Sequence, residues 1–226
     1  MNLTEEQKML QNAASNIAKQ ELAPRAASVD KERVFPREGL RKLGEAGFLG
    51  LTAPETLGGG GADHVSFLLA AEAIAGGCAS TSLVFLTHAL VTRALASGGS
   101  DEQKKRLLPD LIAGRTLGTL AATEPASGSN PLAIATKAVA NGDGFILNGS
   151  KTFITAAGEA DVYLVVLATD QSKSPAELSA LIVEKGNPGF SFGQKEDFMG
   201  LRGASNGELI FENCRVPRTN LLGPEK

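Results

Sequence analysis

The sequence has few of the residues that metal centres and disulfide frameworks need. Its 226 residues include two cysteines, Cys78 and Cys214, and two histidines, His64 and His88. The cysteines lie far apart and form neither a metal motif nor a disulfide framework, so we expect a reducing, cytoplasmic location. Neither histidine has a cysteine or carboxylate at ligand spacing. We therefore expect no metal, and interpret both histidines as satisfied or solvent-facing side chains.

Excess positive charge, a targeting segment and a convincing membrane span are also missing. With 22 basic and 25 acidic residues the net charge is −3, which argues against a nucleic-acid partner. The first ten residues, "MNLTEEQKML", contain neither the basic region nor the apolar stretch of a signal peptide. The most apolar stretch, "CASTSLVFLTHALVTRALA", is interrupted by His88, Arg93 and several hydroxyl residues. It is more typical of a buried helix than of a membrane span.

Three common catalytic motifs do not occur. No G-x-S-x-G follows a predicted strand, which weakens the case for a Ser-His-Asp hydrolase. The run "GGGG" at 58–61 lacks the Lys-Ser/Thr of a phosphate-binding P-loop, and no dinucleotide fingerprint follows a strand. We interpret 58–61 as a loop.

The first half of the chain has helical periodicity. Thr4 with Gln7, and Ser100 with Gln103, form capping boxes that predict helix starts. Pro36 suits the first turn of another helix, and a further helix is predicted to start near Asp63. The apolar stretch 80–97 is hydrophobic nearly all round and is predicted to be central. We therefore expect an all-helical domain over residues 1–116.

From about residue 117 the pattern changes to strands bounded by turn residues. Asn-Gly steps at 141–142 and 148–149 favour tight hairpins. The predicted fold class is α+β, in which the helical domain is followed by an antiparallel β-sheet or barrel domain over 117–226.

Three segments are candidates for a ligand site. In "TEPASGSN", 123–130, Thr123 supplies a hydroxyl, Gly128 allows close backbone approach, and Ser129 with neighbouring N–H groups could hold a phosphate. An ordinary turn is the alternative. In "KTFITAAGEAD", 151–161, strand alternation would place Phe153 and Thr155 on one face, and Thr152 and Ile154 on the other.

An aromatic beside a hydroxyl suits a planar heteroaromatic ring, although both residue types also pack well in strands. The third segment is the stripe Leu83, Leu86 and Leu90, spaced as one face of a helix. It is either core or the wall of a pocket.

Together these segments resemble the acyl-CoA dehydrogenase family of flavoenzymes. The resemblance spans nearly the whole chain in family order. It rests on "LGLTAPETLGGGGAD", "CASTSLVFLTHALV", "LAATEPASGSN", "LNGSKTFITAAGEADVYLVV" and "GLRGASNGELIFENCRVPRTNLLG". The family's N-terminal helical domain and middle β-domain correspond to the two halves defined by periodicity.

The resemblance implies FAD as the cofactor and an acyl-CoA thioester as the substrate. Leu120, Ala122 and Thr123 would lie along the isoalloxazine ring, and Gly128 and Ser129 would meet the pyrophosphate. Ser129 would also lie near the acyl-CoA. In the second flavin segment, Phe153 would shield one ring face, Ile154 would lie beside it, and Thr155 would reach toward N5. The acyl-chain cavity would be lined by the leucine stripe, which consists of Leu83, Leu86 and Leu90.

The implied reaction is α,β-dehydrogenation in fatty acid metabolism, with electrons passing to an electron-transfer flavoprotein and with a homotetramer as the family assembly. The "LRGASNGELIFENCRVP" segment and Leu86 are most similar to short- or branched-chain members. A C-terminal helical domain, which in the family supplies the catalytic glutamate, does not occur in this sequence. We therefore assign no catalytic residue, do not assign Glu124 as the base, and expect this chain to be inactive alone.

Two other readings stay open. The chain could be a non-catalytic flavin- or acyl-CoA-binding or assembly subunit, or it could belong with related flavin oxidases or monooxygenases. It also departs from the family pattern at three positions of the flavin loop. Ala126 and Ser127 stand where Gly and Ala are common, and Asn130 stands where Asp is common.

Overall fold

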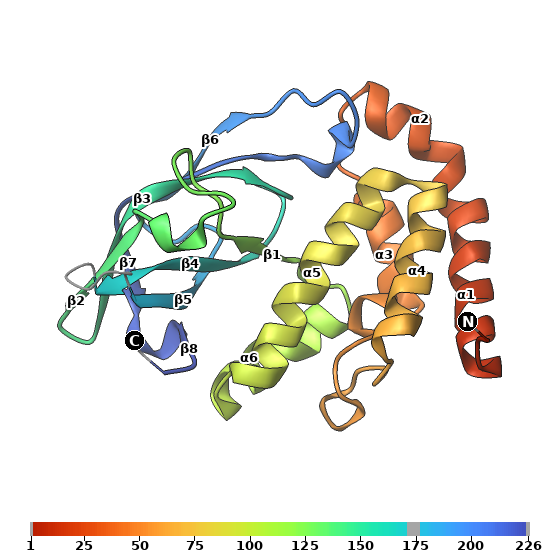
Figure 1. Cartoon of the computed structure of the whole chain (residues 1–226), viewed down its shortest axis with the longest axis horizontal. Helices are drawn as coiled ribbons and strands as arrows, with labels where there is room; N and C mark the ends of the chain where they lie inside the picture. The colour runs from red at the N-terminus through yellow and green to blue at the C-terminus, as the bar shows by residue number, and fades with distance from the viewer. Residues whose placement is uncertain (1, 171–176, 225–226) are drawn as a thin grey trace.

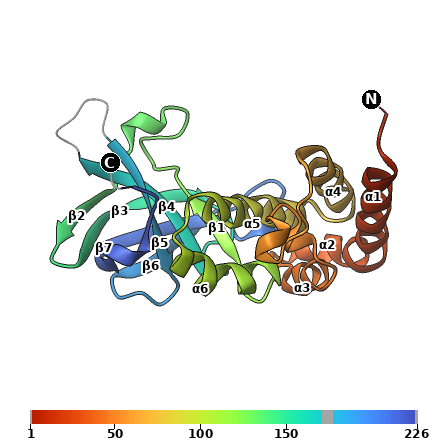
Figure 2. The ribbon, with the colours of Figure 1, turned by 90° about the horizontal axis from the view of Figure 1, so that it is seen from below.

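The computed structural model of the protein describes residues 2–170 and 177–224. Helices form one end of the chain and a sheet forms the other (Figure 1, Figure 2). The helices are α1 (Glu5–Ile17), a π-helical turn (Ala18–Leu22), α2 (Ala23–Lys31), α3 (Arg37–Glu45), α4 (His64–Gly77), α5 (Ala79–Gly98) and α6 (Asp101–Ile112).

The predicted helix starts are confirmed by their caps. Thr4 and Ser100 each accept a hydrogen bond from the third helical residue, whose glutamine side chain accepts from the cap backbone in return. Asp63 caps α4 by accepting from the backbone of Ser66. Such caps satisfy N–H groups that a helix cannot pair internally, so they fix where each helix begins.

Helix α5 is the centre of the helical end. Among the described residues it is the one helix long and apolar enough to cross a membrane by length and composition. However, 56% of its most apolar window is buried inside the protein. It packs against α4, α6 and strand β1 (Gly118–Ala121), and its apolar character follows from this central position.

The strands are β1 (Gly118–Ala121), β2 (Lys137–Asn141), β3 (Gly144–Ile154), β4 (Val162–Asp170), β5 (Glu177–Glu184), β6 (Phe190–Lys195), β7 (Gly207–Pro217) and β8 (Leu221–Leu222). They form one open sheet, in the order β6-β7-β3-β2-β4-β5-β8, with β1 paired to β4. Most pairs are antiparallel, but β1 and β2 each run parallel to β4. Among the described strands the sheet is not closed, so the barrel alternative is wrong.

One of the two predicted hairpins is confirmed and the other is wrong. Asn141 pairs with Gly144 across the tight turn between β2 and β3. The second Asn-Gly step lies inside β3, where the register to β7 shifts between Leu147 and Gly149. Gly149 has φ of 141°, and a Cβ there would lie 2.8 Å from the Thr136 Cα. The glycine therefore serves a bulge and a close backbone approach rather than a turn.

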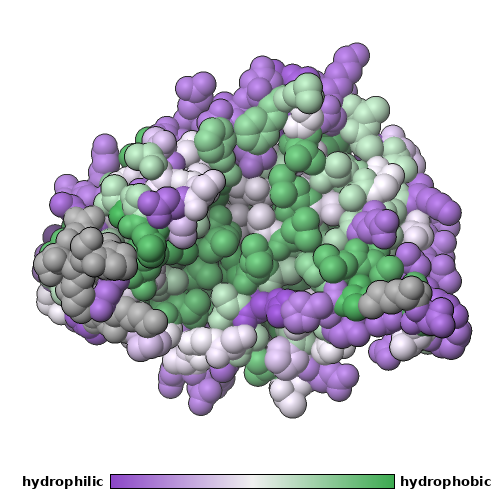
Figure 3. Space-filling model, viewed as in Figure 1, coloured by the Kyte–Doolittle hydropathy of each residue, from purple (hydrophilic) through white to green (hydrophobic). Residues whose placement is uncertain are grey.

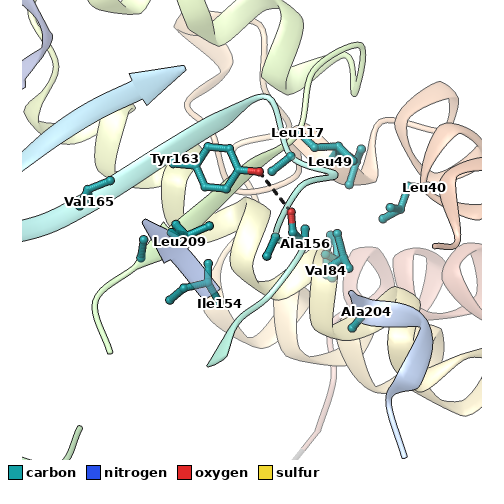
Figure 4. Close-up of a cluster of buried hydrophobic side chains, with 14 of the residues drawn as sticks. Leu40, Leu49, Val84, Leu117, Ile154, Ala156, Tyr163, Val165, Ala204 and Leu209 are labelled. Carbon is teal, nitrogen blue, oxygen red and sulfur yellow. Dashed lines mark hydrogen bonds between the residues drawn. The ribbon is translucent and has the colours of Figure 1, made fainter. Parts of the chain in front are cut away.

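The core is continuous between the helices and the sheet. The buried cluster of Figure 4 includes residues of the helical end, such as Leu40, Leu49 and Val84, and residues of the sheet, such as Ile154 and Leu209. The two ends of the chain are thus packed together. The segment that leaves β3 lies where the helical and sheet halves meet, since Glu159 pairs with Arg37 of α3.

Candidate functional site

The structure brings the two predicted flavin segments together at the ends of β1 and β3. The backbone N–H of Thr152 donates to the carbonyl of Thr123 at 2.9 Å. This bond joins the loop after β1 to the end of β3. Leu120, Ala122, Thr123 and the stretch 153–155 are therefore neighbours at one edge of the sheet, although about thirty residues separate them in sequence.

A buried ion pair holds the first loop in place. The Lys151 Nζ lies 2.7 Å from Glu124 Oε1, and the two side chains are 0% and 4% exposed. The same ammonium donates to the carbonyl of Ala122 at 3.0 Å. The Glu124 carboxylate also accepts from the backbone N–H groups of Ala135, at 2.7 Å, and Thr136, at 2.9 Å.

These partners determine the ionisation of the pair. Burial disfavours the Glu124 carboxylate, but hydrogen bonds from Lys151 and Thr136 outweigh burial and lower its pKa. Burial also lowers the pKa of Lys151, partly offset by Glu124. Glu124 is thus an ionised carboxylate whose oxygens are engaged by neighbours, which agrees with leaving it out of the base role. Sequence reasoning missed Lys151, because nothing in a strand pattern marks a lysine as buried.

The second segment departs from the predicted strand alternation. The register between β3 and β7 shifts between Lys151 and Ile154, and Phe153 has φ of 57°. As a result Phe153 is 54% exposed, whereas Ile154 and Thr155 are both buried. The expectation that Phe153 and Thr155 share one face is therefore wrong. The bulge turns the Phe153 ring outward, where it stacks at 6.2 Å on Phe198.

Thr155 is held by two hydrogen bonds. Its carbonyl accepts from the Thr119 hydroxyl of β1 at 2.8 Å, and its own hydroxyl donates to Asn206 Oδ1 at 3.1 Å. The side-chain nitrogen of Asn206 is buried and has no hydrogen-bond partner among the described residues. Asn206 lies in the quoted "GLRGASNGELIFENCRVP" segment, but no sequence signal separated it from its neighbours.

The turn with the predicted phosphate residues is exposed. Glu124 and Ser127 exchange backbone hydrogen bonds at 2.8 and 3.1 Å, which closes the turn before Gly128 and Ser129. Both of these residues are exposed. A Cβ at Gly128 would meet only the Thr123 methyl, at 4.0 Å. The turn is therefore open to a ligand and well fixed on its protein side.

The leucine stripe of α5 lies at the border of this region. Leu83 and Leu86 are half-buried against the main core, and Leu90 is 52% exposed. Leu120 of β1 packs against the cluster that contains Val91 of the same helix. Figure 3 shows hydrophobic side chains gathered across the middle of the face seen in Figure 1, with hydrophilic side chains around them.

His88 is a structural residue whose hydrogen bonds are satisfied, which is one of the two alternatives that the sequence predicted for the histidines. It is fully buried in α5, and its Nε2 donates to the Leu111 carbonyl at 3.0 Å, while its Nδ1 accepts from the Gly118 N–H at 3.1 Å. Burial lowers its pKa to about 4, so it is neutral. His64 is exposed beside Arg93. Among the described residues no cluster of His, Cys, Asp or Glu could hold a metal ion.

The chain thus has a helical part followed by a sheet part, with a candidate site built by the loop after β1 and the end of β3. Comparison with known proteins agrees. The acyl-CoA dehydrogenase N-terminal domain model matches residues 4–115, and the middle domain model matches residues 119–214. The chain belongs to the acyl-CoA dehydrogenase family.

Individual relatives cover all of this chain. It is 40% identical over 225 residues to the mitochondrial isobutyryl-CoA dehydrogenase of Dictyostelium discoideum, and spans 54% of that protein. The structure of butyryl-CoA dehydrogenase from Megasphaera elsdenii has a TM-score of 0.93 at 35% identity, with 100% of this chain and 60% of that chain covered. The chain thus spans little more than half the length of these relatives.

Two further structures match over the whole chain and over 60% of the other chain. A structure described as the electron transferring flavoprotein of Acidaminococcus fermentans has a TM-score of 0.95 at 42% identity. One described as the FAD complex of PigA has a TM-score of 0.93 at 27% identity.

Proposed function

We propose that this chain forms the flavin-binding part of an FAD-dependent acyl-CoA dehydrogenase acting on short- or branched-chain acyl-CoA thioesters. One observation carries the proposal. The two segments that the family resemblance assigns to FAD lie side by side and are fixed by the Thr152–Thr123 bond and the buried Glu124–Lys151 pair. The names of the isobutyryl-CoA and butyryl-CoA relatives support the substrate class.

The residues present fit a flavin. The site offers an exposed aromatic ring at Phe153, an open glycine turn at Gly128, and a buried amide donor at Asn206 that has no partner among the described residues. An aromatic face suits ring stacking, and open backbone suits a phosphate. FAD, when bound, supplies a hydride acceptor. The chain's own part is to orient that group and to keep water from one of its faces.

We propose the following roles for the residues of the site. Leu120, Ala122 and Thr123 contact the ring edge, and Thr155 supplies a hydroxyl to it. Exposed Gly128 and Ser129 take the pyrophosphate, with Ser129 also near the acyl-CoA.

On the helical side, Leu83, Leu86 and Leu90 border the acyl chain. No carboxylate of this chain is assigned as the base, because Glu124 is engaged by its partners and Glu159 pairs with Arg37 and Lys195. We therefore propose that the 226-residue chain alone does not catalyse the dehydrogenation of acyl-CoA.

The wider assignments are also proposals. We propose an electron-transfer flavoprotein as the electron acceptor, a homotetramer as the assembly, and a domain boundary at residues 116–117. Cytoplasmic location remains a proposal, since the Dictyostelium relative is named as mitochondrial.

The test is a flavin titration followed by anaerobic addition of acyl-CoA. The purified chain is titrated with FAD, and the visible spectrum is recorded before and after adding butyryl-CoA or isobutyryl-CoA. We expect FAD to bind and the flavin to stay oxidised. Bleaching by the acyl-CoA would contradict the proposed inactivity, and would assign the base to this chain. Absence of FAD binding would contradict the flavin-site proposal. Bleaching followed by peroxide release in air would favour an oxidase.

A further inference from the structure

The Asn206 side chain holds a buried donor that the protein itself leaves unused. Asn206 is 6% exposed, and its Oδ1 accepts from the Thr155 hydroxyl at 3.1 Å. Its Nδ2 has no hydrogen-bond partner among the described residues. Burying an amide N–H without a partner destabilises a protein. A buried group of this kind calls for a physical explanation.

The backbone around this side chain is well fixed. The Asn206 carbonyl accepts from the N–H of Glu196 at 2.9 Å, and the Ser205 carbonyl accepts from Ala157 at 2.9 Å. Ser205 has φ of 50°, a left-handed conformation that costs energy for a residue with a side chain. Gly207, the next residue, pairs with Ile154 of β3. The unpaired amide therefore does not result from a loose loop.

The hydroxyl of Thr155 has one proton, and the Asn206 amide decides where it points. In the orientation observed, Thr155 donates to Asn206 and can offer a ligand only a lone pair. If the amide turns by half a rotation, its nitrogen faces Thr155 and donates to the hydroxyl oxygen. The Thr155 proton is then free for a ligand acceptor. The rotation exchanges two atoms of similar size and needs no backbone change.

We propose that Asn206 is a positioning residue that sets the direction of the Thr155 hydroxyl proton toward the flavin ring. This inference rests on the proposed function, in which Thr155 faces the flavin. An oxidised flavin presents a ring nitrogen that accepts, and the turned amide makes Thr155 a donor to it. A reduced flavin carries a hydrogen on that nitrogen, and the observed amide orientation makes Thr155 an acceptor. Asn206 thus lets one hydroxyl serve both states.

The test is a double-variant cycle on FAD affinity and on the spectrum of the bound flavin. We expect Asn206→Leu to weaken FAD binding by about 3- to 10-fold, the range of one hydrogen bond. Thr155→Val should weaken it at least as much. The double variant should bind no more weakly than Thr155→Val, because Asn206 acts only through Thr155. Both single variants should change the visible band of the bound flavin in the same way.

A matched control and a second variant separate the effect of the Asn206 amide from other effects of substitution in this loop. Ser205→Ala removes a neighbouring hydroxyl that donates to the Ala157 carbonyl at 3.2 Å, and should change FAD affinity less than about 2-fold. Asn206→Ala removes the amide without adding apolar bulk, and should behave as Asn206→Leu does. Circular dichroism checks that each variant is folded.

Three results would overturn the inference. If the Asn206 and Thr155 effects multiply in the double variant, the amide has a general structural role. If FAD affinity and the flavin spectrum are unchanged in both Asn206 variants, the amide does not act on Thr155. If the unmodified chain does not bind FAD, the proposed function fails, and this inference fails with it.

Discussion

Replacing Lys151 by methionine tests the buried pair that joins the loop after β1 to strand β3. The substitution keeps a long apolar side chain but removes the charge next to Glu124, whose side chain is 4% exposed. It also removes the donor to the Ala122 carbonyl. Removing one partner of a buried pair leaves the other charge uncompensated, which costs about 3–5 kcal/mol. We therefore expect the free energy of unfolding at pH 7 to fall by that amount.

The assay is urea unfolding followed by circular dichroism, because the chain has no tryptophan. The matched control is Lys8→Met, which breaks the exposed pair between Lys8 and Glu5 and should change stability very little. A loss below about 1 kcal/mol for Lys151→Met would refute the reasoning. It would mean that Glu124 takes up a proton or reaches solvent once its partner is removed.

The pH dependence of the stability of Lys151→Met gives a second check on how the buried pair contributes to folding. In the unmodified chain the Glu124 pKa is lowered from 4.5, so its contribution is present above that pH and is lost as the pH falls through the folded-state pKa. Without Lys151 the buried carboxyl should have a raised pKa, and protonation should relieve its cost. The stability gap between the two proteins should therefore narrow as the pH falls from 7 to 5. A gap that widens would contradict this account.

Three further predictions follow from the described contacts. Burial lowers the folded-state pKa of His88 to about 4, below its ordinary value of 6.5. The free energy of unfolding should therefore fall by about 3 kcal/mol as the pH drops from 6.5 to 4. His88→Asn should remove this pH dependence when stability is measured by urea unfolding. Gly149→Ala should lower the melting temperature more than Gly142→Ala. A Cβ at 149 meets Thr136, whereas one at 142 has nothing within 4 Å, and equal losses would contradict the close approach. Phe153→Ala should leave stability nearly unchanged, since the ring is half exposed, but should weaken FAD binding; a large loss of stability with unchanged FAD affinity would reverse that assignment.

Much of the fold follows from local sequence signals. The capping boxes at Thr4 and Ser100 predicted where two helices begin, because each cap depends only on residues three positions apart. The Asn-Gly step at 141–142 predicted its hairpin for the same reason. The identical step at 148–149 did not form a turn, because β3 continues past it to pair with β7. Long-range pairing overrode local turn preference there.

The candidate site also depends on long-range contacts that local sequence patterns do not predict. The family resemblance predicts that two segments bind FAD, and the structure shows that a backbone bond from Thr152 to Thr123 joins them. Strand alternation failed at Phe153, because a bulge in β3, where the register to β7 shifts, turned its side chain outward. Lys151 and Asn206 were missed, since their importance depends on burial and on partners far away in sequence.

Hydrogen–deuterium exchange with and without FAD tests the central claim most directly. The claim is that this chain holds the flavin between the loop after β1 and the end of β3. We predict that FAD slows exchange in residues 119–129 and 151–156, and that it leaves α4 unchanged. FAD binding that protects another region, such as the cavity lined by Leu22, Phe35 and Cys78, would contradict the account.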